Sequence, residues 1–224
     1  MSSTAAFTGL PIEGMEFYEA LGADNSKTFW QVNKHRYDDH VKAPMRALAE
    51  SLDEYGPFHV FRPHNDLRFA KNKPPYKTAQ GMYGELEGGA GYYVQFSADG
   101  LMVGAGYYSM AKDQLDRFRQ AVVADATGEE LAALVADAER KKLTATAISE
   151  LKTAPRGYDK QHPRIELIRR KGLILTTTVG SPKWIHTKAA AGRIRELWER
   201  ARPVCDWLDA HVGPSTMPPD DRPF

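Results

Sequence analysis

FRPHNDLRFAKNKPPYKT, residues 61–78, is the stretch that most constrains the fold of this chain. Basic and apolar side chains alternate along it, and one carboxylate interrupts the positive charge. Its two adjacent prolines fix φ and remove two backbone donors, which excludes a helix. We therefore predict a short strand over residues 58–62 that leads into an open, irregular loop. The basic residues are Arg62, Arg68, Lys71, Lys73 and Lys77, the carboxylate is Asp66, and the apolar residues are Phe61, Leu67, Phe69 and Tyr76.

The positive charge of residues 61–78 has two interpretations. A guanidinium presents a planar fork that matches phosphate or carboxylate oxygens, and a lysine adds a movable charge, so Arg62, Arg68 and Lys73 could hold an anion. In the other interpretation Asp66 forms a partly buried ion pair with Arg62 or Arg68, and the lysines only keep a loop in water. The sequence leaves both interpretations open.

The composition indicates an ordinary globular protein. Of the 224 residues, 42% are hydrophobic and 26% are charged, which is enough apolar material for a core. The formal net charge is only +1, so any site for a polyanion must be a local patch. We predict a mobile N-terminus over residues 1–12, a single domain over residues 13–212 and a proline-rich tail over residues 213–224.

The chain shows no sequence signal for export or for a membrane. Its N-terminus lacks a basic segment followed by an apolar core, and no apolar run approaches the ~20 residues that cross a bilayer. The single cysteine, Cys205, excludes an intramolecular disulfide. We expect a soluble, cytoplasmic protein without membrane contact.

Helical periodicity dominates the start of the chain. A short helix is predicted over residues 13–21, and Asp24, Asn25 or Ser26 can cap a longer amphipathic helix. Pro44 interrupts that second pattern, which predicts a kink or two abutting helices just before it. The apolar stripe of the second pattern comprises Phe29, Trp30, Val32, Tyr37, Val41, Met45, Leu48, Leu52 and Tyr55.

Strand signals follow in the middle of the chain. Asp99-Gly100 lies between two β-prone runs, which predicts a hairpin with strands near residues 92–97 and 101–107. Gly104 and Gly106 indicate a bulge or a close backbone approach. A buried strand is predicted over residues 173–179, and helices are predicted from Ser109, from a capping box of Thr127 and Glu130, and over residues 163–171, 187–200 and 203–212. The expected class is α+β, with a mainly antiparallel sheet covered by helices.

A second segment with site-like residues follows Lys152. Arg156 could bind an anion and Tyr158 could line a pocket wall beside it. His162 could act as a general acid or base if the fold brings it near Asp66. It could equally be a helix-entry residue that is hydrogen-bonded to the backbone.

Several kinds of site find no support in the sequence. The seven histidines show no metal-ligand spacing, so no metal site is predicted. The serine-nucleophile signatures and the phosphate-binding loop of nucleotide hydrolases are absent. Asp66 with Glu150-Leu151-Lys152 only superficially matches the pieces of a metal-dependent endonuclease.

The sequence resembles a bacterial and fungal family of unknown function, domain of unknown function number twenty-four sixty-one. Residues 62–76 match its signature Arg-x-x-Arg-Asp-x-Arg-Phe-x-x-Asn/Asp-Lys-x-x-Tyr, with Asn65 in place of the second arginine. Two further blocks are similar: residues 25–37 contain Asn-Ser-Lys-Thr-Phe-Trp and His-Arg-Tyr, and residues 155–163 contain Pro-Arg-Gly-Tyr-Asp and His-Pro. The resemblance implies that the matching residues of 62–76 belong to a family pattern, but it implies no activity.

These observations lead to two hypotheses about function. In the first, both basic segments meet in a pocket for a phosphate- or carboxylate-bearing small molecule. The protein would bind that molecule, or also turn it over as an enzyme of unknown reaction. Its ligands would be Arg62, Arg68, Lys73 and Arg156, its walls Tyr76 and Tyr158, and its acid and base Asp66 and His162. In the second, a basic face serves a non-catalytic module that binds RNA or another protein. The sequence indicates no particular cofactor and no oligomeric state.

Overall fold

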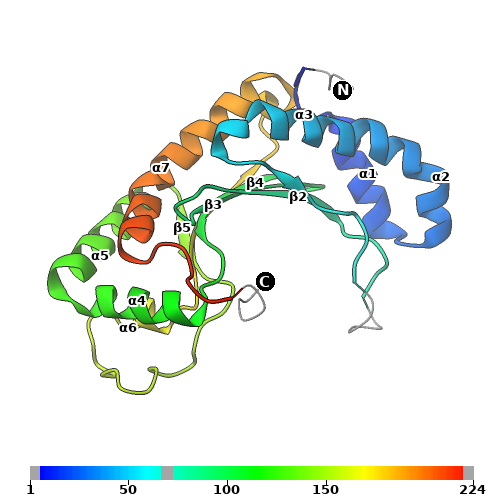
Figure 1. The fold of residues 1–224 in the computed structure, drawn as a ribbon. Helices are drawn as coiled ribbons and strands as arrows, with labels where there is room; N and C mark the ends of the chain where they lie inside the picture. The colour runs from blue at the N-terminus through cyan, green and yellow to red at the C-terminus, as the bar shows by residue number, and fades with distance from the viewer. Residues whose placement is uncertain (1–5, 67–72, 219–224) are drawn as a thin grey trace. The chain divides into compact units, whose positions relative to one another are not determined.

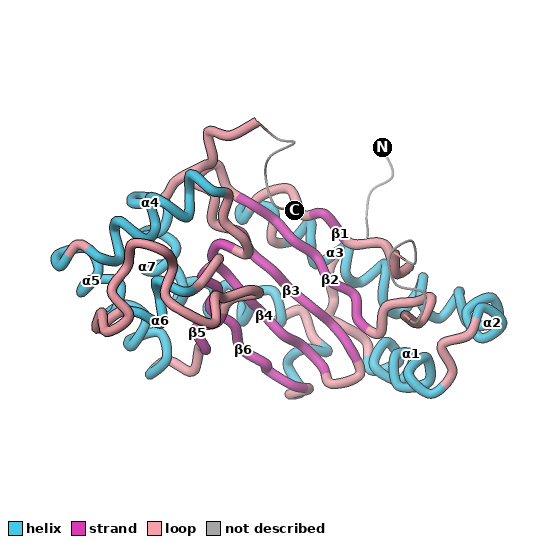
Figure 2. Tube along the Cα trace, turned by 90° about the horizontal axis from the view of Figure 1, so that it is seen from below, coloured by secondary structure: helices cyan, strands magenta, loops and turns pink. Residues whose placement is uncertain are grey.

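The chain contains a six-stranded antiparallel sheet with the strand order β1-β2-β3-β4-β6-β5 (Figures 1 and 2). The computed structural model describes residues 6–66 and 73–218, and it confirms the predicted α+β class. The strands are β1 (His59–Val60), β2 (Ala79–Glu85), β3 (Gly91–Ser97), β4 (Gly100–Tyr107), β5 (Thr144–Thr146) and β6 (Leu173–Gly180). The helices are α1 (Ile12–Ala23), α2 (Lys27–Tyr37), α3 (Ala43–Ser51), α4 (Lys112–Val123), α5 (Asp125–Arg140), α6 (Ile165–Arg169) and α7 (Ala189–His211).

The chain divides into two compact units. Unit 1 comprises Met1–Gly84, Tyr93–Val103 and Thr178–Glu196, and unit 2 comprises Glu85–Tyr92, Gly104–Thr177 and Leu197–Phe224. The strands β2, β3, β4 and β6 and the helix α7 each contribute residues to both units. The two predicted basic segments therefore belong to different units, residues 61–78 to the first and residues 155–163 to the second.

A π-helical turn over Asp38–Lys42 joins α2 to α3 in unit 1 and confirms the predicted interruption before Pro44. Pro44 has no N–H and cannot donate to the carbonyl of His40 four residues earlier, so a wider turn relieves the clash. Gly14 of α1 packs against that carbonyl: a Cβ on Gly14 would lie 2.5 Å from His40 O. The proline thus explains both the turn and the close approach of α1.

The capping prediction for α2 is confirmed, but the predicted apolar stripe is wrong at one position. Ser26 accepts a hydrogen bond from the N–H of Phe29 at 3.0 Å. Val32 is 68% exposed, because the buried residues of α2 are Trp30 and Tyr37 and a residue two positions after Trp30 lies on the far side of the helix.

The sheet contains two strands that the sequence analysis missed, β2 and β5, and β5 pairs with β6. β2 lies in a glycine-rich stretch and forms because it pairs with β1, with Val60 opposite Met82. The β3–β4 hairpin at Asp99-Gly100 is confirmed. Gly106 has φ +130°, and a Cβ there would lie 2.3 Å from Leu173 O, so the predicted close backbone approach is also confirmed.

Two of the helix starts predicted in unit 2 are wrong, whereas α6 lies within the predicted residues 163–171. Ala111, not Ser109, precedes α4, and Gln114 accepts a hydrogen bond from the N–H of Ala111. α5 begins at Asp125, so Thr127 lies inside the helix, where its hydroxyl donates to Ala121 O instead of forming a capping box with Glu130. At α4 a side-chain amide therefore takes the place of the hydroxyl that we assigned to the helix start.

The last two predicted helices form the single helix α7, which continues through Pro203. A proline inside a helix costs about 3 kcal/mol. An uninterrupted apolar stripe offsets that cost, because its members are buried at spacings of three and four residues. The stripe comprises Ile194, Trp198, Ala201, Cys205 and Leu208.

Both ends of the described chain are anchored. Leu10 is fully buried and its N–H donates to Ile185 O at 2.8 Å, which holds the chain before α1 against unit 1. The carboxylate of Asp113 accepts hydrogen bonds from Ser215 and Thr216, which hold the start of the tail against α4. Among the described residues, no helix has the length and hydropathy needed to cross a bilayer.

Candidate functional site

Residues 61–66 and 73–78 of unit 1 form two arms that pair with each other, which we call the basic hairpin. Asn65 N donates to Pro75 O at 2.9 Å, Lys77 N donates to Pro63 O at 2.7 Å, and His64 pairs with Tyr76 in an antiparallel bridge. The N–H of Phe61 donates to Gly81 O, so the hairpin continues the pairing of β1 with β2. The predicted strand is shorter than expected, and the described arms pair with each other instead of forming the open loop that we predicted.

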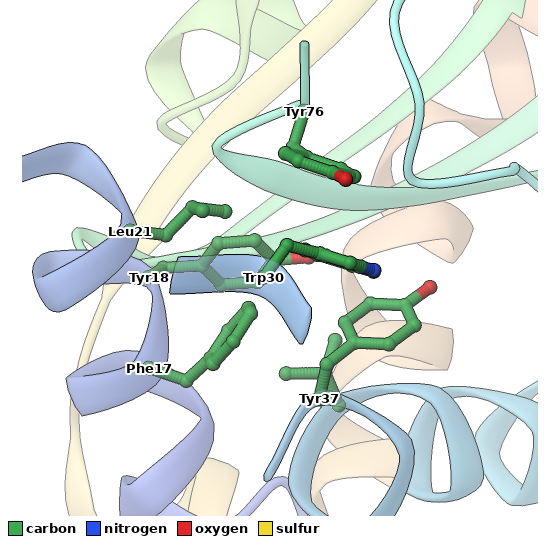
Figure 3. Packing of buried hydrophobic residues seen from close by; sticks show 7 residues of the cluster. Phe17, Tyr18, Leu21, Trp30, Tyr37 and Tyr76 are labelled. Atoms are coloured by element: carbon green, nitrogen blue, oxygen red, sulfur yellow. The ribbon is translucent and has the colours of Figure 1, made fainter. Parts of the chain in front are cut away.

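Tyr76 anchors the basic hairpin in an aromatic cluster. Its ring stacks on Trp30 at 4.2 Å between centroids with 6° between the planes, and Figure 3 shows the indole lying flat below it. Asn25 clamps the Tyr76 backbone with two hydrogen bonds of 3.0 Å, one to the carbonyl and one from the N–H. The residue is only 6% exposed, so its main role is packing and a ligand on the hairpin would meet little more than its edge.

A buried polar chain links the same cluster to the base of the hairpin. The hydroxyl of Tyr37 donates to Gln80 Oε1 at 2.7 Å, and Gln80 Nε2 donates to Phe61 O at 2.7 Å. Burial, together with the nearby Asp38 carboxylate, raises the pKa of Tyr37 to about 12. Tyr37 therefore stays a neutral donor at physiological pH and fixes the position of the hairpin.

The exposed face of the hairpin gathers positive charge. Arg62 is 67% exposed and lies 4.0 Å from Asp66, which is a long contact for an ion pair. Lys77 Nζ donates to Arg62 O at 3.1 Å and lies 5.5 Å from the centre of the Phe61 ring. Partial burial lowers the pKa of Lys77, and the nearby Arg62 cation lowers it further. Arg62 and Lys77 are thus near enough for one cation to lower the pKa of the other, and Asp66 lies 4.0 Å from the guanidinium.

Of three further residues in this stretch, the structure describes Lys73 and Asn65 but not Arg68. Lys73 is exposed. Asn65 donates from its side-chain amide to Pro74 O at 2.8 Å and braces the hairpin. Arg68 lies outside the described residues, so its role as an anion ligand stays a prediction.

The second basic segment is held by its own backbone in unit 2. His162 Nδ1 accepts a hydrogen bond from the N–H of Arg164 at 3.1 Å, and the N–H of His162 donates to Asp159 O. This is the geometry of a helix-entry residue, the second of our two interpretations. Arg156 is exposed and Tyr158 is half-buried. A pocket that would join Arg156, Tyr158 and His162 to the basic hairpin stays a prediction.

Four other arginines have a structural role that the sequence analysis did not recognise. Each donates to carbonyl oxygens at the end of a helix, where backbone acceptors lack helical partners. Arg164 donates to Val122 O at 2.7 Å and to Val123 O at 3.0 Å at the end of α4. The others are Arg117 on Val212 O after α7, Arg119 on Ile168 O in α6, and Arg195 on Ser51 O of α3. Basic residues in this chain are therefore often internal braces.

Unit 1 also contains a groove of about 600 Å³ that the sequence did not signal. It lies between the segment before α1 and the start of α3, and Thr8, Asp39 and Arg46 are among its lining residues. Charges of both signs line it. Asp38 accepts a hydrogen bond from Lys34, which holds the pKa of its carboxyl below the usual value. The groove therefore shows no clear preference for one sign of ligand charge.

No metal site is evident in the part of the chain that the structure describes. Within residues 6–66 and 73–218, no three histidine, cysteine, aspartate or glutamate side chains converge in a way that could hold an ion.

Comparison with known proteins gives one match. The family model described as conserved hypothetical protein (DUF2461) matches residues 13–207. The chain belongs to the DUF2461 family. Neither a curated protein nor a solved structure matches the chain. The DUF2461 match covers the basic hairpin, the aromatic cluster and the second basic segment, and it assigns no activity to any of them.

Proposed function

We propose that the basic hairpin binds a small molecule that carries a phosphate or carboxylate group. The observation that carries this proposal is the closeness of Arg62 and Lys77 on one hairpin, with Asp66 4.0 Å from the guanidinium. Like charges held together repel each other, and an anion placed between them relieves that repulsion. Arg62 supplies a planar fork for two oxygens, and Lys77 supplies a point charge.

The anchoring of the hairpin supports this proposal. Binding is tighter when the ligand groups are already ordered, because less conformational entropy is lost. Tyr76 is stacked on Trp30 and clamped by Asn25, so the backbone that carries Lys77 is fixed from below. In the proposed site Arg62 and Lys77 contact the anion directly, Lys73 adds charge from the same arm, and Asp66 orients Arg62.

The binding hypothesis also includes residues outside the described hairpin. Arg68 would add a second guanidinium, and Arg156 and Tyr158 stay candidate anion-binding residues within unit 2. If the protein also turns its ligand over, Asp66 and His162 are the acid and base candidates. The binding proposal for Arg62 and Lys77 does not depend on these additions.

A second candidate, RNA binding, is favoured by two aromatic rings beside the cations. Phe61 and Tyr93 are half-buried with ring centres 6.3 Å apart, over a glycine position at Gly81 where a Cβ would lie 2.7 Å from Tyr93 Oη. Aromatic rings on a sheet beside basic residues can stack on the bases of single-stranded RNA. Lys77 already lies over the Phe61 ring, which limits the free stacking surface. We therefore rank this candidate second.

The two candidates can be separated by thermal shift with nucleotides, sugar phosphates and organic acids, followed by calorimetry on any compound that stabilises the protein. We expect Arg62→Gln and Lys77→Gln each to lower affinity for that compound about tenfold, since a hydrogen bond to a charged group contributes roughly 1.5–3 kcal/mol. Lys188→Gln removes one exposed charge elsewhere in unit 1 and should leave affinity unchanged. Equal binding by the Arg62→Gln/Lys77→Gln double variant and wild type would refute the proposal.

The RNA candidate makes a different prediction about salt. Retention of a single-stranded RNA oligonucleotide should fall steeply between 50 and 200 mM salt if several phosphates are bound, as it does for proteins with many phosphate contacts. A site for one small anion responds much more weakly. Silence toward all small anions together with salt-sensitive RNA retention would favour the second candidate.

A further inference from the structure

A serine and a histidine of unit 1 lie in hydrogen-bonding contact, and neither belongs to the basic hairpin or to the second basic segment. Ser181 Oγ is 3.2 Å from His186 Nε2. The other ring nitrogen of the histidine, Nδ1, is 2.7 Å from Leu10 O. This is the arrangement of a nucleophile, a base and a group that orients the base.

The carbonyl of Leu10 determines which nitrogen of His186 carries the proton. A carbonyl oxygen only accepts hydrogen bonds, so in the neutral imidazole Nδ1 must be the donor. The Nε2 lone pair then faces Ser181 and accepts the proton of its hydroxyl. Met15 Sδ also lies 3.3 Å from Ser181 Oγ, but a thioether is a weak acceptor and does not compete with an imidazole nitrogen.

The backbone around the pair is tightly constrained. A short helical turn over Lys183–His186 follows Pro182, and the N–H of Ile185 donates to Pro182 O at 3.0 Å. Leu10 contacts this turn twice, because its N–H donates to Ile185 O and its carbonyl accepts from His186. Gly9 has φ +133°, and a Cβ there would lie 2.3 Å from the backbone carbon of His186. The imidazole is therefore held from two chain segments.

Exposure is distributed as a reactive pair requires. Ser181 is exposed and His186 is half-buried, whereas Leu10 and Ile185 behind them are fully buried. The hydroxyl is thus open to a substrate, while the base and its orienting carbonyl rest on the core. Cys205 is buried and the hydroxyl of Thr187 donates to Trp184 O, so neither group combines exposure with contact to a base.

We propose that Ser181 and His186 form a nucleophile and general-base pair that accepts the acyl group of a carboxylic ester. Ser181 Oγ forms a bond to the carbonyl carbon as its proton passes to His186 Nε2. The bond from that carbon to the leaving oxygen then breaks, and the leaving group takes the proton from the imidazole. Water attacks the acyl-serine with the same base, which releases the carboxylic acid and restores the hydroxyl.

This proposal is independent of the anion site, because it uses none of the same residues. It was not visible in the sequence for a physical reason. Gly180-Ser181-Pro182 matches no nucleophile signature, and the orienting group is a backbone carbonyl 176 positions away from the histidine. Only the fold brings the three groups together.

The test uses the full chain with p-nitrophenyl acetate and with a fluorophosphonate probe, and intact and peptide mass spectrometry locate the adduct. We expect both reagents to modify Ser181, and we expect Ser181→Ala to lose that adduct. His186→Gln should slow modification roughly 10²-fold, since a positioned general base contributes at least that much. Ser149→Ala, a change at an exposed serine in unit 2, should react as wild type does.

A second variant keeps the test decisive if His186→Gln is unstable, since His186 also binds Leu10. Ser181→Cys places a thiol beside the imidazole, and iodoacetamide should alkylate it faster than it alkylates a cysteine placed at Ser149, because a neighbouring base raises the thiolate fraction. The buried Cys205 should stay unmodified in both proteins. Equal alkylation at the two positions, or equal labelling of wild type and Ser181→Ala by the probe, would overturn the proposal.

Discussion

Two arginines of this chain are used in opposite ways, Arg62 in the basic hairpin and Arg164 directly after the second basic segment. In the basic hairpin, Arg62 is 67% exposed and its described acidic contact is 4.0 Å long. Arg164 is only 9% exposed and donates to two helix-end carbonyls and to Asp125. Exposure and contacts among the described residues thus separate an arginine that is a ligand candidate from one that braces the fold, and a cluster of positive charge in the sequence does not reveal this difference.

The largest expected effect tests what holds the hairpin in place. Trp30→Ala removes the ring on which Tyr76 stacks and leaves a cavity in the aromatic cluster of unit 1. We expect a loss of about 4 kcal/mol in the free energy of unfolding, measured by urea denaturation. Val32→Ala on the exposed side of the same helix should cost less than about 0.5 kcal/mol. A small effect of Trp30→Ala would mean that the hairpin does not depend on the cluster.

The next effect tests the structural arginine. Arg164→Met keeps the length of the side chain but leaves the carbonyls of Val122 and Val123 without their donors, so we expect a loss of about 3 kcal/mol in unfolding free energy. Asp125→Asn should cost less than about 0.5 kcal/mol, because the side chain of Asp125 is 90% exposed and the ion pair is screened by water. If the two variants were equally unstable, the ion pair and not the carbonyls would be the important contact.

The sequence correctly predicted two features that depend only on neighbouring residues. The Asp99-Gly100 hairpin and the Ser26 cap depend on residues within four positions, and both were predicted. β2 depends on its strand partner, and the continuation of α7 through Pro203 depends on the buried apolar stripe of that helix. Local sequence rules predicted neither. The candidate site follows the same division. The positive charge of residues 61–78 was visible in the sequence, but the stacking of Tyr76 and the contact of Ser181 with His186 were not.

A smaller effect concerns pH and the tail in unit 2. Partial burial raises the pKa of Asp113, but hydrogen bonds from Thr216, Ser215 and Arg117 outweigh burial and hold it well below its usual range. A carboxyl with a lowered folded-state pKa stabilises the protein above its unfolded-state pKa, and that contribution is lost as pH falls toward the folded-state value. We expect urea midpoints of wild type to fall between pH 5 and pH 2 more steeply than those of Asp113→Asn. Parallel curves would show that the tail contact adds no stability.

The smallest expected effect on stability tests whether Arg62 is a ligand group or a structural arginine like Arg164. Arg62→Gln should change the free energy of unfolding by less than about 0.5 kcal/mol, because an exposed side chain with a long contact contributes little. Arg193→Gln, which removes an equally exposed arginine paired with Glu196 at 2.8 Å, is the matched control for a surface charge. If Arg62 were a brace like Arg164, its loss would cost several times more than the loss of Arg193. An unchanged urea midpoint for Arg62→Gln, combined with weaker binding of the stabilising anion, would place Arg62 among the ligand groups and Arg164 among the structural ones.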